Sequence, residues 1–159
     1  MGLLAQHRYT PNEKITFEYG ARFDVHSEVD NPIFSPRAAL LYSASDQFRL
    51  RTAVSSGFRA PEVFDEDLHI SNVGGELFTT FNDPALQEES SLTASISPEW
   101  DLNDNWRLEL NGFHTWLDNT LVVEPDDLPS TPNVREFLRT NGESSRIFGA
   151  ELNLAYDQP

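Results

Sequence analysis

A strict two-residue alternation between Ile15 and His26 places the strongest constraint on the fold of this chain. In this stretch of twelve residues every odd-numbered position is apolar and every even-numbered position is polar, charged or glycine. A helix would mix apolar and charged side chains such as Tyr19 and Arg22 along one stripe, whereas a strand separates them onto two faces. The segment is about twice as long as the usual strand of a globular protein. A long strand with one apolar and one charged face is typical of the tilted spans of a membrane β-barrel.

The same alternation recurs along the chain and begins almost at Met1. It is weaker in one segment, where Ala39 and Leu41 lie on the side expected to be polar. Pro98 predicts a bulge near the end of its strand, because proline cannot donate to a ladder. The sequence therefore predicts an all-β, antiparallel, up-and-down segment of a transmembrane β-barrel with about seven strands. The further alternating segments are 37–44, 48–58, 90–102, 106–117 and 146–156.

The connections between these segments alternate between short and long. The short ones are rich in turn-forming residues, and fall at residues 11–14, 46–47 and 103–105. The long ones lie between them, at residues 28–35, 59–89 and 118–144. Hairpins with short turns at one end and long loops at the other are typical of outer-membrane barrels, with the short turns in the periplasm and the long loops outside the cell.

Aromatic residues predict two girdles at the membrane interfaces. Phe48 and Phe58, like Trp106 and Trp116, are ten residues apart on one strand face, which is roughly 33 Å along a strand. At a tilt of about 40° this projects to roughly 25 Å, the height of the apolar band of a membrane barrel. Trp100 would join Trp106 across the turn at residues 103–105. The alternative is that these aromatic side chains belong to an ordinary protein core.

Composition excludes several classes of protein. The net charge of −15 argues against binding to nucleic acid, whose phosphates would be repelled, and favours either cationic or metal-bearing partners or simple hydration of the loops. The chain has no cysteine, so it can form neither a disulfide nor a thiolate metal site. No run of residues approaches the roughly 18 apolar residues of a membrane-spanning helix.

The chain contains no recognisable catalytic motif, which predicts that it is not an enzyme and needs no cofactor. The best candidates for ligand or metal binding are Asp65, Glu66, Asp67 and His69, which follow one strand in a long loop, with Asp83 not far away. Hard cations such as calcium bind several carboxylate oxygens. This loop lacks the spacing of a known calcium motif, so hydrated loop charge is the stronger interpretation.

Four segments, in order and spacing, resemble the C-terminal half of the barrel of TonB-dependent outer-membrane receptors. In that family a strand ends in an aromatic-Arg-Ala-Pro corner at the outer surface, and an Asn-Pro-x-Leu-x-Pro-Glu-like segment leads back into the membrane. Here the corner is Arg59-Ala60-Pro61, where Pro61 ends the ladder and Arg59 can pair with carboxylates. The chain departs from the second motif at Gln87, where proline is usual. The resembling segments are GFRAPEVFDEDLH (57–69), NDPALQEESS (82–91), FHTWLDNTL (113–121) and RTNGESSRIFGAELNLAY (139–156).

This resemblance implies a 22-stranded barrel closed by an N-terminal plug, in which residues 1–159 form part of the single barrel domain and the plug and final strands lie elsewhere. It implies outer-membrane lipid, the TonB complex (through the plug region) and a small nutrient as partners, and transport of a siderophore–iron complex or a corrinoid. The loops that begin at Arg59 and Asp118 would capture the ligand. A passive porin-like barrel and a soluble β-sandwich binding module remain the alternatives.

Overall fold

The computed structural model describes residues 1–27, 29, 31–61, 77–125 and 134–157. These residues form β-strands joined by turns, and no helix among them is long and apolar enough to cross a membrane. The strands are β1 (Gly2–Asn12), β2 (Ile15–Asp24), β3 (Ile33–Ser45), β4 (Phe48–Arg59), β5 (Leu77–Asn82), β6 (Glu89–Asp101), β7 (Trp106–Asp118), β8 (Leu121–Pro125), β9 (Val134–Asn141) and β10 (Ser145–Tyr156).

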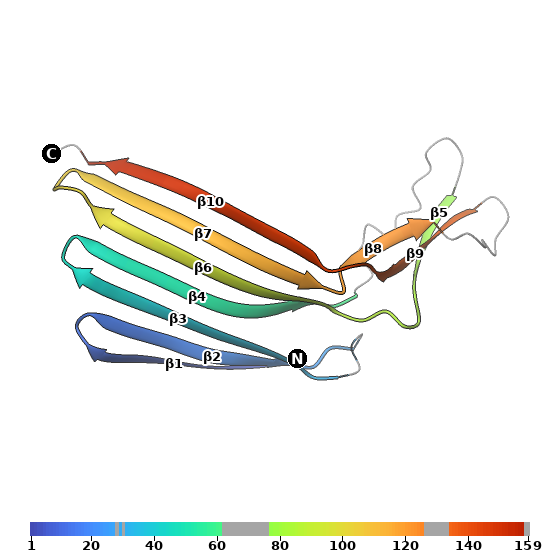
Figure 1. Cartoon of the computed structure of the whole chain (residues 1–159). Helices are drawn as coiled ribbons and strands as arrows, with labels where there is room; N and C mark the ends of the chain where they lie inside the picture. The colour runs from blue at the N-terminus through green and yellow to red at the C-terminus, as the bar shows by residue number, and fades with distance from the viewer. Residues whose placement is uncertain (28, 30, 62–76, 126–133, 158–159) are drawn as a thin grey trace.

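Seven of these strands form one antiparallel sheet in the order β1-β2-β3-β4-β6-β7-β10. Each is hydrogen-bonded to the preceding long strand in the chain, so the sheet is an up-and-down meander. Figure 1 shows the three short turns together at one end of the sheet and the long connections at the other. The predicted class, number of long strands and distribution of loops are therefore confirmed.

Two details of the long strands differ from the prediction. β3 begins at Ile33 rather than at Arg37, because Ile33 and Phe34 continue the ladder opposite Asp24 and Phe23 of β2. β2 ends at Asp24 rather than at His26, so the connection between β2 and β3 covers residues 25–32 and is as long as the predicted connection at 28–35. Local alternation does not reveal this extension, which depends on the length of the neighbouring strand.

The predicted bulge at Pro98 is wrong. Pro98 lies opposite Leu50 in an unshifted ladder between β4 and β6. On the β7 side the paired positions are interrupted between Ile96 and Glu99, and the register is the same before and after the gap. The missing N–H donor is thus accommodated by a gap in one ladder, without the extra residue that a bulge requires.

The long sheet has an apolar face and a polar face, and no layer of described residues covers the apolar face. Alternation along each strand and the register between strands bring Phe17, Leu40 and similar residues into rows on the apolar face. Its side chains are open, with Phe34 57% and Phe148 76% exposed. Among the described residues, the buried apolar residues are Ala60 and Pro61, at the end of β4. The packed core that a soluble β-sandwich needs is therefore missing here, and the apolar face requires hydrocarbon.

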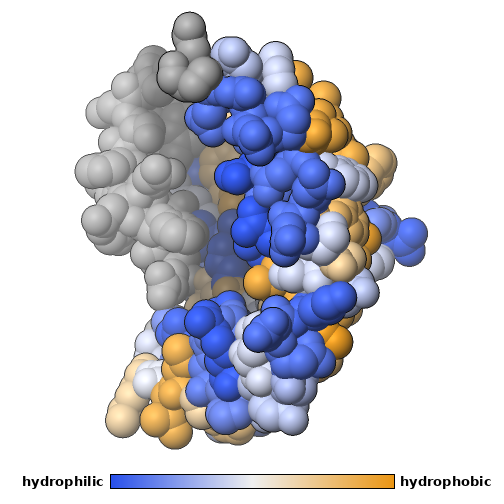
Figure 2. Space-filling view, turned by 90° about the vertical axis from the view of Figure 1, so that its left-hand side faces the viewer, coloured by the Kyte–Doolittle hydropathy of each residue, from blue (hydrophilic) through white to orange (hydrophobic). Residues whose placement is uncertain are grey.

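Figure 2 shows hydrophilic residues toward the hollow of the curved sheet and hydrophobic residues along the opposite side. We call the polar side the inner face and the apolar side the outer face. On the inner face lie, for example, Glu18 of β2 and its partner Ala39 of β3. Ala39 and Leu41, which weakened the alternation of their segment, are inner-face residues next to charged side chains.

A second, three-stranded sheet has the order β5-β9-β8. β9 pairs with β5 in parallel and with β8 in antiparallel orientation. β5 belongs to the connection between β4 and β6, and β8 and β9 to the connection between β7 and β10. The two long connections, which the sequence analysis treated as loops, are thus joined to each other by backbone hydrogen bonds beyond the end of the long sheet (Figure 1).

The two-faced sheet predicts the labelling pattern of a photoactivatable probe confined to the membrane interior. In the complete protein we expect the probe to mark Phe17 and Tyr19, which lie on the outer face, and to spare Glu18 and Arg22, which lie on the inner face. Peptide mass spectrometry of the labelled protein measures this directly. Labelling of Glu18 and Arg22 in place of their apolar neighbours would show that the faces are assigned the wrong way round.

Candidate functional site: the inner face and the base of the long loops

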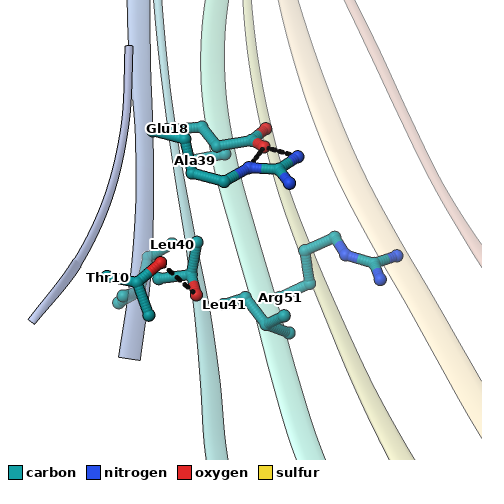
Figure 3. Close-up of a pocket in the computed structure, with 8 residues that line it drawn as sticks. Thr10, Glu18, Ala39, Leu40, Leu41 and Arg51 are labelled. Carbon is teal, nitrogen blue, oxygen red and sulfur yellow. Dashed lines mark hydrogen bonds and ion pairs between the residues drawn. The ribbon is translucent and has the colours of Figure 1, made fainter. Parts of the chain in front are cut away.

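The inner face carries a hollow of about 380 Å³ over β1 to β4. Register places Thr16 opposite Leu41, and Leu41 opposite Arg51, so residues far apart in sequence share this wall. Figure 3 shows the side chains around it. The hollow is lined by Arg8, Thr10, Thr16, Glu18, Ala39, Leu40, Leu41 and Arg51.

Two arginines in this hollow differ in their surroundings. Arg8 forms an ion pair with Glu18 on the neighbouring strand. The hydroxyls of Thr10 and Thr16 are hydrogen-bonded at 3.3 Å. Arg51 is exposed and extends away from the Arg8–Glu18 pair (Figure 3). It makes no ion pair or side-chain hydrogen bond within the part of the chain that the structure describes, so its charge is available to a partner that is not among these residues.

A second hollow of about 490 Å³ lies on β1 to β4 closer to the long loops, and Arg22, Arg37 and Ala39 are among its lining residues. Arg22 forms an ion pair with Asp24, with 2.7 Å between Nε and Oδ2, and Asp24 is only 5% exposed. Arg37 is exposed and, like Arg51, has no ion-pair partner among the described residues. Ala39 is among the lining residues of both hollows.

Four charged side chains form a network on the inner face near the short turns. Arg49 of β4 pairs with Glu99 of β6 and lies 3.9 Å from Asp101. Arg107 of β7 lies 3.3 Å from Glu99, and its Nε donates to Oδ1 of Asp101 at 2.7 Å. A single exposed ion pair contributes little to the stability of a fold, and ion pairs that form a network contribute more. This one connects three neighbouring strands at the end of the wall that lies opposite the long loops.

The Arg-Ala-Pro corner ends β4 as the sequence predicted. The Nη2 atom of Arg59 lies 3.0 Å from Oε2 of Glu89, the first residue of β6. The same carboxylate oxygen accepts the backbone N–H of Leu121, at the start of β8, at 3.1 Å. Glu89 therefore fixes the end of β4 and the start of β8 to the same point on the wall.

A cluster of three amide side chains, Gln87, Asn119 and Asn141, joins the bases of the two long connections. The carboxamide oxygen of Asn141 accepts the backbone N–H of Gln87 at 2.7 Å, and its Nδ2 donates to the carbonyls of Gln87 and Asn119, both at 3.0 Å. Asn119 has a φ of 55°, a left-handed conformation that asparagine tolerates better than most residues. We call these residues the amide cluster.

The amide cluster was not identified from the sequence, although one signal pointed to it. At position 87 proline is usual in the receptors that this chain resembles, and a proline has no N–H to donate. The N–H of Gln87 makes the shortest hydrogen bond of the cluster. The departure from the motif thus provides a contact that the usual residue could not make.

The predicted loop residues are only partly placed. Asp65, Glu66, Asp67 and His69 lie outside the described residues. Asp83 closes a turn, because its Oδ1 accepts the backbone N–H of Ala85 at 2.7 Å. No group of three or more potential metal-ligating side chains occurs in the described part of the chain. The suggested metal site at these acids remains an untested prediction.

The predicted girdle aromatics all lie on the outer face. Phe48 packs against Trp100 across the β4–β6 pair in a tilted arrangement with ring centroids 4.9 Å apart, near the short turns. Trp106 packs at 4.8 Å on Tyr156 of β10 at the same end. Toward the long loops, Trp116 stacks on His114 at 4.1 Å, and Phe58 lies next to the end of β4. This placement agrees with two aromatic levels, and their contact with a membrane interface stays a prediction.

Replacing Asn141 by alanine should loosen the three-stranded sheet. The change removes the three hydrogen bonds of the Asn141 side chain, and local opening of β8 and β9 should become easier by about 1–3 kcal/mol, the usual cost of unsatisfied polar groups. We expect faster backbone hydrogen exchange in residues 134–141 of the complete protein in detergent micelles, measured by mass spectrometry.

The matched control is Asn153→Ala, since Asn153 lies on the inner face of β10 and makes no side-chain hydrogen bond among the described residues. Its exchange pattern should equal that of the unaltered protein. The Gln87→Pro variant, which removes the backbone donor to Asn141 and the side-chain acceptor of Asn119, should give an intermediate effect. Equal exchange in the Asn141 and Asn153 variants would contradict the assigned role.

The chain is similar in sequence to known β-barrel proteins over nearly its whole length. The family described as "TonB dependent receptor-like, beta-barrel" matches residues 1–157. The "Iron-regulated outer membrane virulence protein" of Vibrio cholerae serotype O1 (strain O395) is 24% identical in an alignment of 153 residues that covers 90% of this chain and 22% of that protein.

Solved structures show the same fold. The siderophore receptor PirA from Pseudomonas aeruginosa superposes with a TM-score of 0.81 at 19% identity, over 96% of this chain and 30% of the receptor. The Serratia marcescens hemophore receptor HasR, solved as a double mutant with its hemophore HasA and heme, gives a TM-score of 0.72 at 17% identity, over 99% and 31% of the two chains. The chain thus spans less than a third of the length of each of these proteins.

Proposed function

This chain belongs to the family of TonB-dependent receptor-like β-barrels, and from that premise we propose that it forms part of the wall of an outer-membrane receptor for a scarce, iron-bearing nutrient. The observation that carries the proposal is the seven-stranded sheet itself. It has an outer face without a protein core and an inner face lined by charged side chains. Such a wall separates lipid from a polar lumen.

The nutrient that we propose is a siderophore–iron complex or heme. The names of the similar proteins support this class, because they describe an iron-regulated outer-membrane protein, a siderophore receptor and a hemophore receptor. A corrinoid stays a further candidate that the uptake experiment can include. A porin-like barrel would share the two-faced wall but would need no energy source for uptake.

We propose that the barrel is completed by strands beyond both ends of this sheet. β1 and β10 each have a neighbour on one side only. In hydrocarbon, each unpaired backbone N–H or C=O costs several kcal/mol. Residues 1–159 would accordingly belong to a single barrel domain, and a plug domain elsewhere in the protein would contact TonB. We expect lipid at the outer face, the nutrient at the joined long loops, and no nucleic acid.

Uptake of radioactive iron tests this proposal. Cells that make the complete protein should accumulate iron from a ferric siderophore or heme in a saturable manner, and this accumulation should disappear in a matched strain that lacks TonB. Cells with an empty vector are the control. Uptake that is linear with concentration and equal in both strains would favour a passive porin and overturn the proposal.

A further inference from the structure

The charges on the inner face are distributed unevenly over the sheet. The inner positions of β1 to β4 carry six arginines and two acids, although the chain as a whole has a net charge of −15. The inner positions of β6, β7 and β10 carry one arginine and five acids. The wall is therefore divided into a cationic half and an acidic half. The arginines of the cationic half are Arg8, Arg22, Arg37, Arg49, Arg51 and Arg59.

Ion pairs account for four of these six arginines. Arg8 and Arg22 pair with acids on the cationic half itself, and Arg49 and Arg59 pair with acids of β6. The two that remain are Arg37 and Arg51. Within the residues that the structure describes, neither forms an ion pair or a side-chain hydrogen bond, and both are exposed.

The two unpaired arginines are arranged along the strands, one nearer the long loops and one nearer the short turns. Arg51 of β4 lies opposite Leu41 of β3, and Leu41 lies four residues from Arg37 along β3. The Cα atoms of Arg37 and Arg51 are therefore separated by about 13 Å along the strand direction. Between them the inner face carries the opposed alanines Ala39 and Ala53. These side chains are small, and Ala39 lines both the hollow at Arg37 and the hollow at Arg51.

We propose that Arg37 and Arg51 are two successive binding sites for carboxylate groups of an anionic solute that moves along the inner face. A guanidinium group binds a carboxylate through two parallel hydrogen bonds and stays charged at all physiological pH values. Two separated sites of this kind hold the solute without trapping it, since a solute that passes through a lumen must also be released. This deepens the proposed function, on which it rests, by giving the transported nutrient a charge and a chemical group.

Chemical labelling of arginine in the complete protein, purified in detergent micelles, tests the proposal without requiring transport. Phenylglyoxal modifies accessible guanidinium groups, and peptide mass spectrometry reports the rate at each arginine. We use citrate, a tricarboxylate, as the probe, with chloride at equal ionic strength as the reference condition. Citrate should slow the modification of Arg37 and Arg51 several-fold, whereas the rate at Arg146 should not change.

Arg146 is the matched control because it is also exposed and without an ion-pair partner among the described residues, but lies on the outer face opposite Trp116. Equal rates with and without citrate at Arg37 and Arg51 would overturn the proposal. It would also be overturned if neither arginine reacted in chloride, because an acidic side chain from another part of the protein would then occupy both sites.

Equilibrium binding of radioactive citrate gives the second measurement. The double variant Arg37→Gln/Arg51→Gln should bind citrate at least about tenfold more weakly, the factor expected when a hydrogen bond to a charged group is lost. Arg146→Gln should bind like the unaltered protein, and Arg37→Lys/Arg51→Lys should recover part of the affinity because it keeps the charge. Unchanged binding by the double glutamine variant would refute the sites. Failure of TonB-dependent iron uptake would overturn the proposed function alone, because both measurements here are made on purified protein.

Discussion

The structure depends on the requirement that a backbone in hydrocarbon must satisfy its own hydrogen bonds. The long strands between β1 and β10 meet this requirement by pairing on both sides with the preceding and following long strands, which fixes a single meandering sheet. Once the backbone is paired, the alternation of side chains determines which residues meet lipid and which meet the lumen. On the outer face of the described long strands, charge occurs only at Asp118 and Arg146, both next to the long loops. All other charges of these strands are therefore directed to the inner face.

Because the charges are confined to one face, the register between strands determines which charged side chains of the wall lie next to each other. Glu99 meets both Arg49 and Arg107 because β6 lies between β4 and β7, and a shift of any ladder by one residue would move these charges toward lipid. The same register leaves Arg37 and Arg51 beside small or apolar neighbours. A single strand does not reveal all of the paired arginines, because the acidic partners of Arg8, Arg49 and Arg59 lie on neighbouring strands.

The dependence of side-chain pairing on neighbouring strands explains which features could be predicted from the sequence alone. The long strands, their number and the sorting of short and long connections follow from local alternation and turn residues, and Pro61 marked the end of β4 correctly. The three strands of the loop sheet were missed because β5 pairs with β9 in parallel, across a long separation in sequence. A parallel pairing between distant segments produces no periodic pattern within either segment. Pro98 was misjudged for a related reason, because whether a missing donor needs a bulge depends on the neighbouring strand.

The connection between the loop sheet and the wall is made by side chains that bind backbone groups. Glu89 accepts from the N–H of Leu121, and Asn141 binds the backbone of the opposite loop. Because Ala60 and Pro61 are the buried apolar residues among the described ones, these contacts, and no larger apolar core, fix the two long connections relative to the wall. Hydrogen bonds of this kind are directional, so they set the orientation of β8 and β9 as well as their distance from the barrel. A ligand that contacted either connection would therefore meet both as one body, held at the rim beside the ends of β6, β7 and β10.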